Sequence, residues 1–206
     1  YYDITPIKEI NGNTPSAGPP VVNASTISLS ASASGTVLTI SDTAADSLQV
    51  NDFVTIAGAG TIGGNVTAAV INQEYMIANI ISGTQYTVYL RNAGTSVNGV
   101  SFTVAPTTSV LTFPVGTTIS NGDKVVLLPT ITPPVGLANG TVYYVVSASG
   151  VTCKLAATSG GTPISITSTG AANQAVYFLL TSNTTGTNSA ATITLTYQIN
   201  TGYPIY

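Results

Sequence analysis

The sequence predicts an all-β protein: two tandem small antiparallel β-barrel or sandwich modules with extended terminal arms. Three observations support this fold class. Short alternating runs rich in Val, Ile, Thr and Tyr follow one another, each bounded by Gly, Asn or Ser. No run of about 11 or more residues has the apolar spacing and caps of a helix. The same series of motifs then occurs twice, which is typical of a modular architecture.

Residues 1–22 differ in composition from the rest of the chain. They begin with two tyrosines and alternate loosely, and Pro15, Pro19 and Pro20 then cluster with glycine. Clustered Pro and Gly are typical of linkers and turns. We therefore expect an extended N-terminal arm followed by a linker.

The first module is expected at residues 23–100. Its strands are predicted at residues 26–30, 36–41, 52–56, 74–81 and 85–90. The one candidate for a helix is a short turn around residues 67–70.

The second module is expected at residues 101–189, because the motifs of the first recur there in the same order. The matches are residues 37–39 with 110–112, 50–54 with 121–125, 74–77 with 142–145, 82–83 with 149–150, and 87–90 with 152–155. Asp52 and Asp123 hold equivalent places before an apolar strand, so we expect each to shape a tight turn. The repeated Ser-Gly pair predicts a hairpin in each copy.

The last part of the chain is less repetitive. Strands are predicted at residues 163–167, 175–180 and 191–199, with a polar loop over 182–189. Residues 190–206 are expected to form a separate C-terminal strand and an aromatic tail.

The composition removes most side-chain chemistry. The chain has no His, one Cys, 4 Lys+Arg and 7 Asp+Glu, and charged residues make up 5% of it, against roughly 25% in an ordinary globular domain. Without His there is no Ser-His or Cys-His mechanism, and a zinc site lacks its usual ligands. Too few cations exist to neutralise a nucleic-acid backbone. Cys153 lies in an alternating run and is expected to be a small residue on a strand.

We therefore expect a non-enzymatic protein with no cofactor and no metal. We also expect no nucleic-acid, membrane or small-molecule partner. A surface with so little charge suits a subunit that packs against other proteins.

The two termini carry the candidate contact residues. Tyrosine is enriched at protein interfaces, where it gives contact area and a polar group. The predicted inter-subunit contacts are Tyr1, Tyr2, Ile4, Ile7, Tyr203 and Tyr206. The alternative is that both ends fold back on their own domain.

The motifs at residues 121–125, 134–146 and 155–161, with the variant copy at 51–59 and 72–75, resemble a known family. It comprises tandem β-modules of phage virion and tail proteins, and is often labelled after the first-catalytic-cysteine half-domain of ubiquitin-activating enzymes. The resemblance covers roughly residues 36–170. It implies a structural protein of a bacteriophage virion, a tail component, whose partners are copies of itself and other virion proteins. It implies no ubiquitin chemistry, because Cys153 matches no catalytic motif.

Two other interpretations remain open. One is a secreted archaeal or bacterial filament or surface-layer subunit, located outside the cell and joined by donor-strand exchange. Four Asn-X-Ser/Thr sequons, at Asn23, Asn65, Asn139 and Asn183, are compatible with it. The other is a carbohydrate-binding module, which the absence of Trp disfavours.

Overall fold

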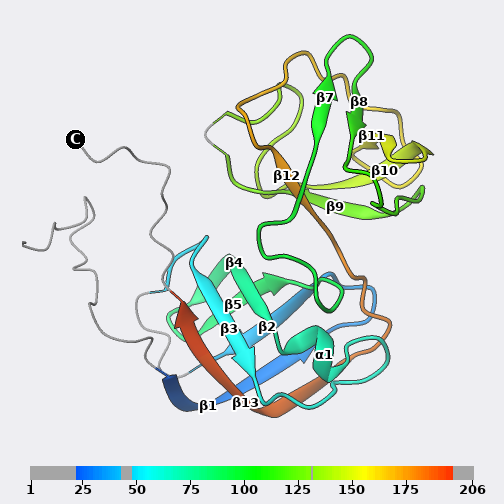
Figure 1. The fold of residues 1–206 in the computed structure, drawn as a ribbon. Helices are drawn as coiled ribbons and strands as arrows, with labels where there is room; N and C mark the ends of the chain where they lie inside the picture. Colours follow the sequence, from blue (N-terminus) through cyan, green and yellow to red (C-terminus); the bar gives the residue numbers. More distant parts are fainter. Residues whose placement is uncertain (1–21, 43–47, 131, 197–206) are drawn as a thin grey trace, which may run out of the picture.

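The computed structural model describes residues 22–42, 48–130 and 132–196, and within them two β-barrels are joined by two chain segments (Figure 1). The predicted all-β class with two small antiparallel barrel modules is confirmed. The described helix is α1 (Ala68–Ile71), which coincides with the predicted short turn. Thr67 caps it, since its hydroxyl oxygen accepts a hydrogen bond from the Val70 amide.

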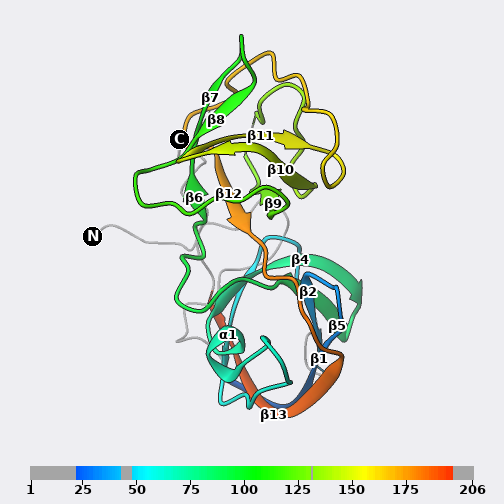
Figure 2. The ribbon, with the colours of Figure 1, turned by 90° about the vertical axis from the view of Figure 1, so that its right-hand side faces the viewer.

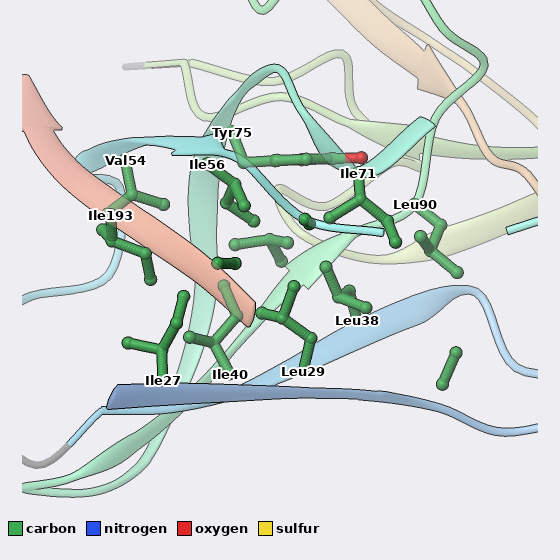
Figure 3. Packing of buried hydrophobic residues seen from close by; sticks show 14 of the residues in the cluster. Ile27, Leu29, Leu38, Ile40, Val54, Ile56, Ile71, Tyr75, Leu90 and Ile193 are labelled. Atoms are coloured by element: carbon green, nitrogen blue, oxygen red, sulfur yellow. The ribbon is translucent and has the colours of Figure 1, made fainter. Parts of the chain in front are cut away.

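The first barrel is a closed sheet in the order β1-β13-β3-β4-β5-β2, with antiparallel neighbours throughout. Its strands are β1 (Val22–Ala31), β2 (Val37–Ser41), β3 (Phe53–Ala57), β4 (Glu74–Ser82), β5 (Gln85–Tyr89) and β13 (Gly186–Thr196). Alternate residues point inward and form one core, because a closed sheet has a single interior. Figure 3 shows part of this core, with Ile27, Leu38, Ile56 and Ile193 converging from four strands.

The helix closes one end of this barrel. Val70 and Ile71 are buried and belong to the same core cluster as the strand residues. Figure 2 shows α1 within the outline of the first barrel.

The second barrel contains seven short strands in the order β6-β12-β9-β10-β11-β8-β7. They are β6 (Val100–Ser101), β7 (Thr103–Ala105), β8 (Val110–Thr112), β9 (Lys124–Leu127), β10 (Val142–Ser149), β11 (Thr152–Ala156) and β12 (Ala175–Phe178). The outer two, β6 and β7, are separated in sequence only by Phe102, whose amide donates to the Gln174 carbonyl at 3.0 Å. Residues 100–105 therefore act as one strand that joins both ends of the sheet around a second core.

The two barrels have the same pairing order. In each, the first strand lies between the second and the last, and the third lies between the last and the fourth. The second barrel occupies the connection between β5 and β13, which are the fifth and last strands of the first barrel. The second module is thus inserted into the first.

This connectivity differs from the predicted division at residue 189, which assigned residues 190–206 to a separate C-terminal strand. Strand β13 begins at Gly186, inside the predicted polar loop, and pairs with both β1 and β3 (Figure 1). Alternation along a strand identifies the face that meets a core, but the strands beside it are chosen by long-range pairing.

The two aspartate turns repeat in detail, which confirms the predicted role of Asp52 and Asp123. The Asp52 carboxylate accepts from the Gln49 amide at 2.8 Å, and the Asp123 carboxylate accepts from the Ser120 amide at 2.8 Å. The residue before each aspartate has a positive φ, 77° at Asn51 and 93° for the glycine at 122. Asn and Gly are the residues that adopt this conformation at low cost.

The predicted strand at residues 163–167 is wrong. Pro163 makes an isolated bridge with Ala156, and the following residues form no strand. The Ile166 amide instead donates to the Ser109 hydroxyl at 2.9 Å, while its side chain is fully buried in the second core. The alternating pattern here reflects a loop that covers the barrel.

Replacing either turn aspartate with alanine should lower the free energy of unfolding by about 1 kcal/mol, because a backbone amide of the turn loses its charged acceptor. Asp52→Asn and Asp123→Asn should retain most of the stability, since the amide oxygen still accepts. Urea unfolding of the full chain measures both effects. Equal stability of the Ala and Asn variants would contradict the turn role.

Candidate functional site

The predicted contact residues Tyr1, Tyr2, Ile4, Ile7, Tyr203 and Tyr206 lie outside the described residues. The structure does show where the two terminal segments attach. Val22 of β1 pairs with Thr194 of β13, so the segments before Val22 and after Thr196 leave the first barrel from neighbouring points. Figure 1 shows the start of β1 and the end of β13 on the same side of this barrel.

The same end of the first barrel carries two exposed apolar side chains. Val50, in the loop before β3, is 47% exposed, and Ile81, beside the β4–β5 hairpin, is 51% exposed. The β3 residue Phe53 pairs with Thr196, which places the Val50 loop at the end from which the C-terminal segment leaves.

The inserted barrel is attached at the opposite end of the first barrel. The Leu90 amide, at the start of the outgoing linker, donates to Thr36 in the β1–β2 turn at 2.8 Å. In the returning linker, Ser182 bonds to both Ser34 and Gly35 of the same turn. The two linkers to the second barrel therefore attach at the end of the first barrel opposite the terminal segments, while the second barrel packs against the outer side of β3 and β4.

A third apolar cluster joins the two barrels. Its buried members are Met76 of the first barrel and Val126 and Tyr177 of the second. Around them pack Phe53, Tyr89, Leu128, Val142 and Leu179. The Tyr89 hydroxyl also donates to the Gly140 carbonyl at 3.0 Å, so the contact has both apolar and polar parts.

Arg91 is the central residue of this junction. It follows β5, is 1% exposed, and its guanidinium lies 5.1 Å from the centre of the Tyr75 ring and 4.8 Å from that of Tyr177. One ring belongs to each barrel, so the cation stacks between the two modules. Burial lowers the pKa of Arg91, and electrostatic interactions with Tyr177, Tyr75 and Glu74 oppose that shift.

The hydrogen bonds of Arg91 fix the outgoing linker. The guanidinium donates to the carbonyls of Glu74, Thr95 and Ser96, the last two at 2.8 and 2.9 Å. The Tyr177 hydroxyl donates to the Val97 carbonyl of the same linker. Burial raises the pKa of Tyr177 to about 12, so this hydroxyl keeps its proton at neutral pH.

A cleft of about 270 Å³ runs along the junction. Its walls are mostly apolar, and its lining comprises Val50, Asn51, Met76, Ile77, Ala78, Tyr89, Val126, Leu127, Leu128, Pro129, Asn139 and Gly140. The one titratable group in that lining is Tyr89, whose pKa is raised by burial. The lining of this cleft therefore provides apolar contact surface, and it contains no pair of side chains that could act as acid and base.

Cys153 points into the second core and is 1% exposed, as expected for a small residue on a strand. Burial, with a smaller effect of Asp123, raises the pKa of its thiol to about 11. Among the residues described, no three His, Cys, Asp or Glu side chains gather to hold a metal ion. No helix in the described ranges has the length and apolar character of a membrane span.

Two of the sequons take part in a clasp between the β3–β4 loop and the returning linker. Asn65 and Asn183 exchange hydrogen bonds, each backbone amide donating to the other's side-chain oxygen at 2.9 and 3.0 Å. The side-chain nitrogen of Asn65 donates to the Thr181 carbonyl at 2.8 Å. A glycan on Asn65 would displace this contact.

Scans against family models, curated proteins and solved structures find no significant match to this chain.

The junction between the barrels was not predicted from the sequence. One feature of the sequence does indicate it. Phe53 and Met76 are large and apolar, although they alternate with the core residues Val54 and Tyr75 and so lie on the outer face of their strands. An apolar residue on the outer face of a half-buried strand indicates a second contact surface. Arg91 gave a second signal, since it is one of very few cations and follows a strand directly.

Arg91→Met should lower the free energy of unfolding by about 2–4 kcal/mol, because three part-buried carbonyls lose their donor while the stem volume is kept. The substitution should also weaken the contact between the two barrels. Small-angle X-ray scattering would then measure a larger radius of gyration. The matched control is Lys154→Met on the outer face of β11. An Arg91→Met variant as stable and compact as Lys154→Met would contradict this role.

Cys153 should resist thiol reagents at pH 8 in the native protein and react at once in urea, because reaction requires an exposed thiolate. A Val115→Cys variant, whose site is 97% exposed, should react immediately and serves as the control. Above pH 9 the unfolded thiol ionises while the native thiol keeps its proton. The free energy of unfolding should therefore fall between about pH 9 and 11, and less so in Cys153→Ala. Rapid native labelling would show that the second core opens.

Proposed function

We propose that this chain is a non-enzymatic structural protein of a bacteriophage virion, a tail component that assembles with copies of itself and with other virion proteins. The resemblance of residues 36–170 to phage β-modules supports the phage setting. Two barrels joined by a buried cation and an apolar cluster support a structural role. The scarcity of charge supports surfaces that face other protein.

The placement of the terminal attachments is the observation that carries this proposal. Both terminal segments bear tyrosines, and both start from paired strands at one end of the first barrel. The second barrel is attached at the other end. This arrangement keeps the attachment points of both tyrosine-bearing segments away from the linkers, so those segments can contact neighbouring subunits.

The alternative, a secreted archaeal or bacterial filament or surface-layer subunit joined by donor-strand exchange, is less well supported. Donor-strand exchange needs a sheet edge that can accept a strand. In the described part of the chain, β1 already has β13 and β2 as neighbours, and the ends of the second sheet are joined through Phe102. The Asn65 clasp also opposes glycosylation at that sequon.

Replacing the four terminal tyrosines, Tyr1, Tyr2, Tyr203 and Tyr206, with serine should weaken self-association, because interface aromatic residues carry much of the binding energy. Sedimentation velocity of the full chain measures the association, and a loss on the order of ten-fold or more is expected. Thermal unfolding should not change.

The matched control replaces the same residues with phenylalanine, which keeps the ring area. Unaltered association of the serine variant would contradict the assembly role of the termini. Mass spectrometry and antibody-labelled electron microscopy of purified virions test the location. A particle without this chain would contradict the virion assignment.

A further inference from the structure

The cleft along the junction is apolar and smaller than most small-molecule sites. Its volume is about 270 Å³, whereas pockets that enclose drug-sized ligands measure roughly 300–1,000 Å³. One wall comes from the first barrel, at residues 50–51 and 76–78, and the other comes from the second barrel, at residues 126–129 and 139–140. A space of this size and chemistry suits a few side chains of a polypeptide better than a cofactor.

Val50 is an apolar side chain that the described residues leave partly uncovered in this cleft. It is 47% exposed, while Met76 and Ile77 in the same wall are buried. Met76 also belongs to the apolar cluster that joins the barrels, so the surface around Val50 continues an interface that is already formed. Contiguous apolar surface of this kind is typical of a contact site.

The direction of β13 leads the chain to this surface. Strand β13 runs antiparallel to β3, with Thr196 opposite Phe53. Extending this register by three residues brings Ile199 beside Val50. Three extended residues span roughly 10 Å, which is about two strand spacings. The segment that follows Thr196 is therefore long enough to reach the Val50 wall of the cleft within its first few residues.

The chemistry of residues 197–202 matches that of the cleft. Their sequence, Tyr-Gln-Ile-Asn-Thr-Gly, contains no charged residue, and no charged side chain lines the cleft. Neither surface would therefore lose a hydrated charge on contact. Asn51 and Asn139 are exposed, one in each wall. Their amide groups can donate to and accept from the backbone of an extended segment.

We propose that residues 197–202 bind in the junction cleft of their own chain, with the side chain of Ile199 packed against Val50. The covalent link to β13 gives this segment a high effective concentration at the cleft, so it occupies the site ahead of a segment from another copy. The bound segment contacts both walls of the cleft, and it therefore strengthens the contact between the two barrels.

This docking goes beyond the proposed function and does not depend on it. Gly202 adopts turn conformations at low cost, so the chain can leave the cleft at that residue. Tyr203 and Tyr206 follow it and stay available to neighbouring subunits. The two tyrosines are then presented from the junction between the barrels rather than from the end of a free tail.

Hydrogen–deuterium exchange of the full chain, measured by mass spectrometry at a dilution where the chain is monomeric, tests the docking. The amides of residues 197–202 should exchange more slowly than those of residues 203–206, by roughly ten-fold or more. Ile199→Ser should remove most of this difference, because the segment loses its apolar anchor. The matched control is Ile205→Ser, the same substitution beyond Gly202, which should leave the exchange of residues 197–202 unchanged.

Filling the cleft gives a second test that leaves the segment itself intact. Ala78 lines the cleft, so Ala78→Tyr places a ring where the segment would bind and should speed the exchange of residues 197–202. Val115→Tyr, at a site that is 97% exposed, is the control. Circular dichroism and urea unfolding check that each variant is folded. Slow exchange that survives both Ile199→Ser and Ala78→Tyr would reflect a simple continuation of β13, and would overturn the docking.

Failure of this inference can be told apart from failure of the proposed function. Fast exchange of residues 197–202 at every concentration, with association that still needs the terminal tyrosines, would overturn the docking and leave the assembly role intact. Slow exchange that appears only when copies associate would show that the segment binds a neighbouring copy, which also overturns docking within one chain. Slow exchange in a chain that never associates would support the docking and contradict the proposed function.

Discussion

Closure of the first barrel by β13 is the constraint on which the rest of the structure depends. Without β13, strands β1 and β3 would each have an unpaired edge, and Ala191 and Ile193 would be missing from the core. Because β13 follows the whole second barrel in sequence, the pair Ile27–Ala191 joins positions far apart in the chain. Such long-range pairing is slow to form, since the loop must close before its contacts stabilise anything. The inserted barrel reduces this cost when it folds first, because its two ends, β6 and β12, then lie side by side.

The second barrel is held in place by a few residues of different chemistry. The apolar part of the junction is non-directional, but the guanidinium of Arg91 needs its rings and carbonyls in fixed positions. A buried cation is costly unless it is hydrogen-bonded, and both terminal nitrogens of Arg91 donate to carbonyls at the junction. Arg91 therefore specifies one orientation of the two barrels, and the apolar cluster supplies most of the burial.

Much of the fold was predictable from the sequence, and the parts that were not share one cause. Alternation located most of the strands, and the repeat located the equivalent turns at Asp52 and Asp123, because these features depend on neighbours in sequence. The partner of β13 and the role of Arg91 depend on which strands meet in space, which periodicity does not record. The same holds for the junction: Phe53 and Lys124 hold equivalent positions in the two copies, yet only the structure shows that Phe53 packs in the apolar cluster between the barrels.

The pairing of β1 with β13 also determines how the molecule responds to mechanical tension. A pull applied through the two terminal segments enters at Val22 and Thr196, on adjacent antiparallel strands. It would peel these strands apart from that end, breaking their hydrogen bonds one after another rather than all together. The inserted barrel lies outside this load path, because both of its connections leave from the opposite end of the first barrel. Tension would reach the inserted barrel only after the first barrel had opened, and it would then enter through the paired strands β6 and β12.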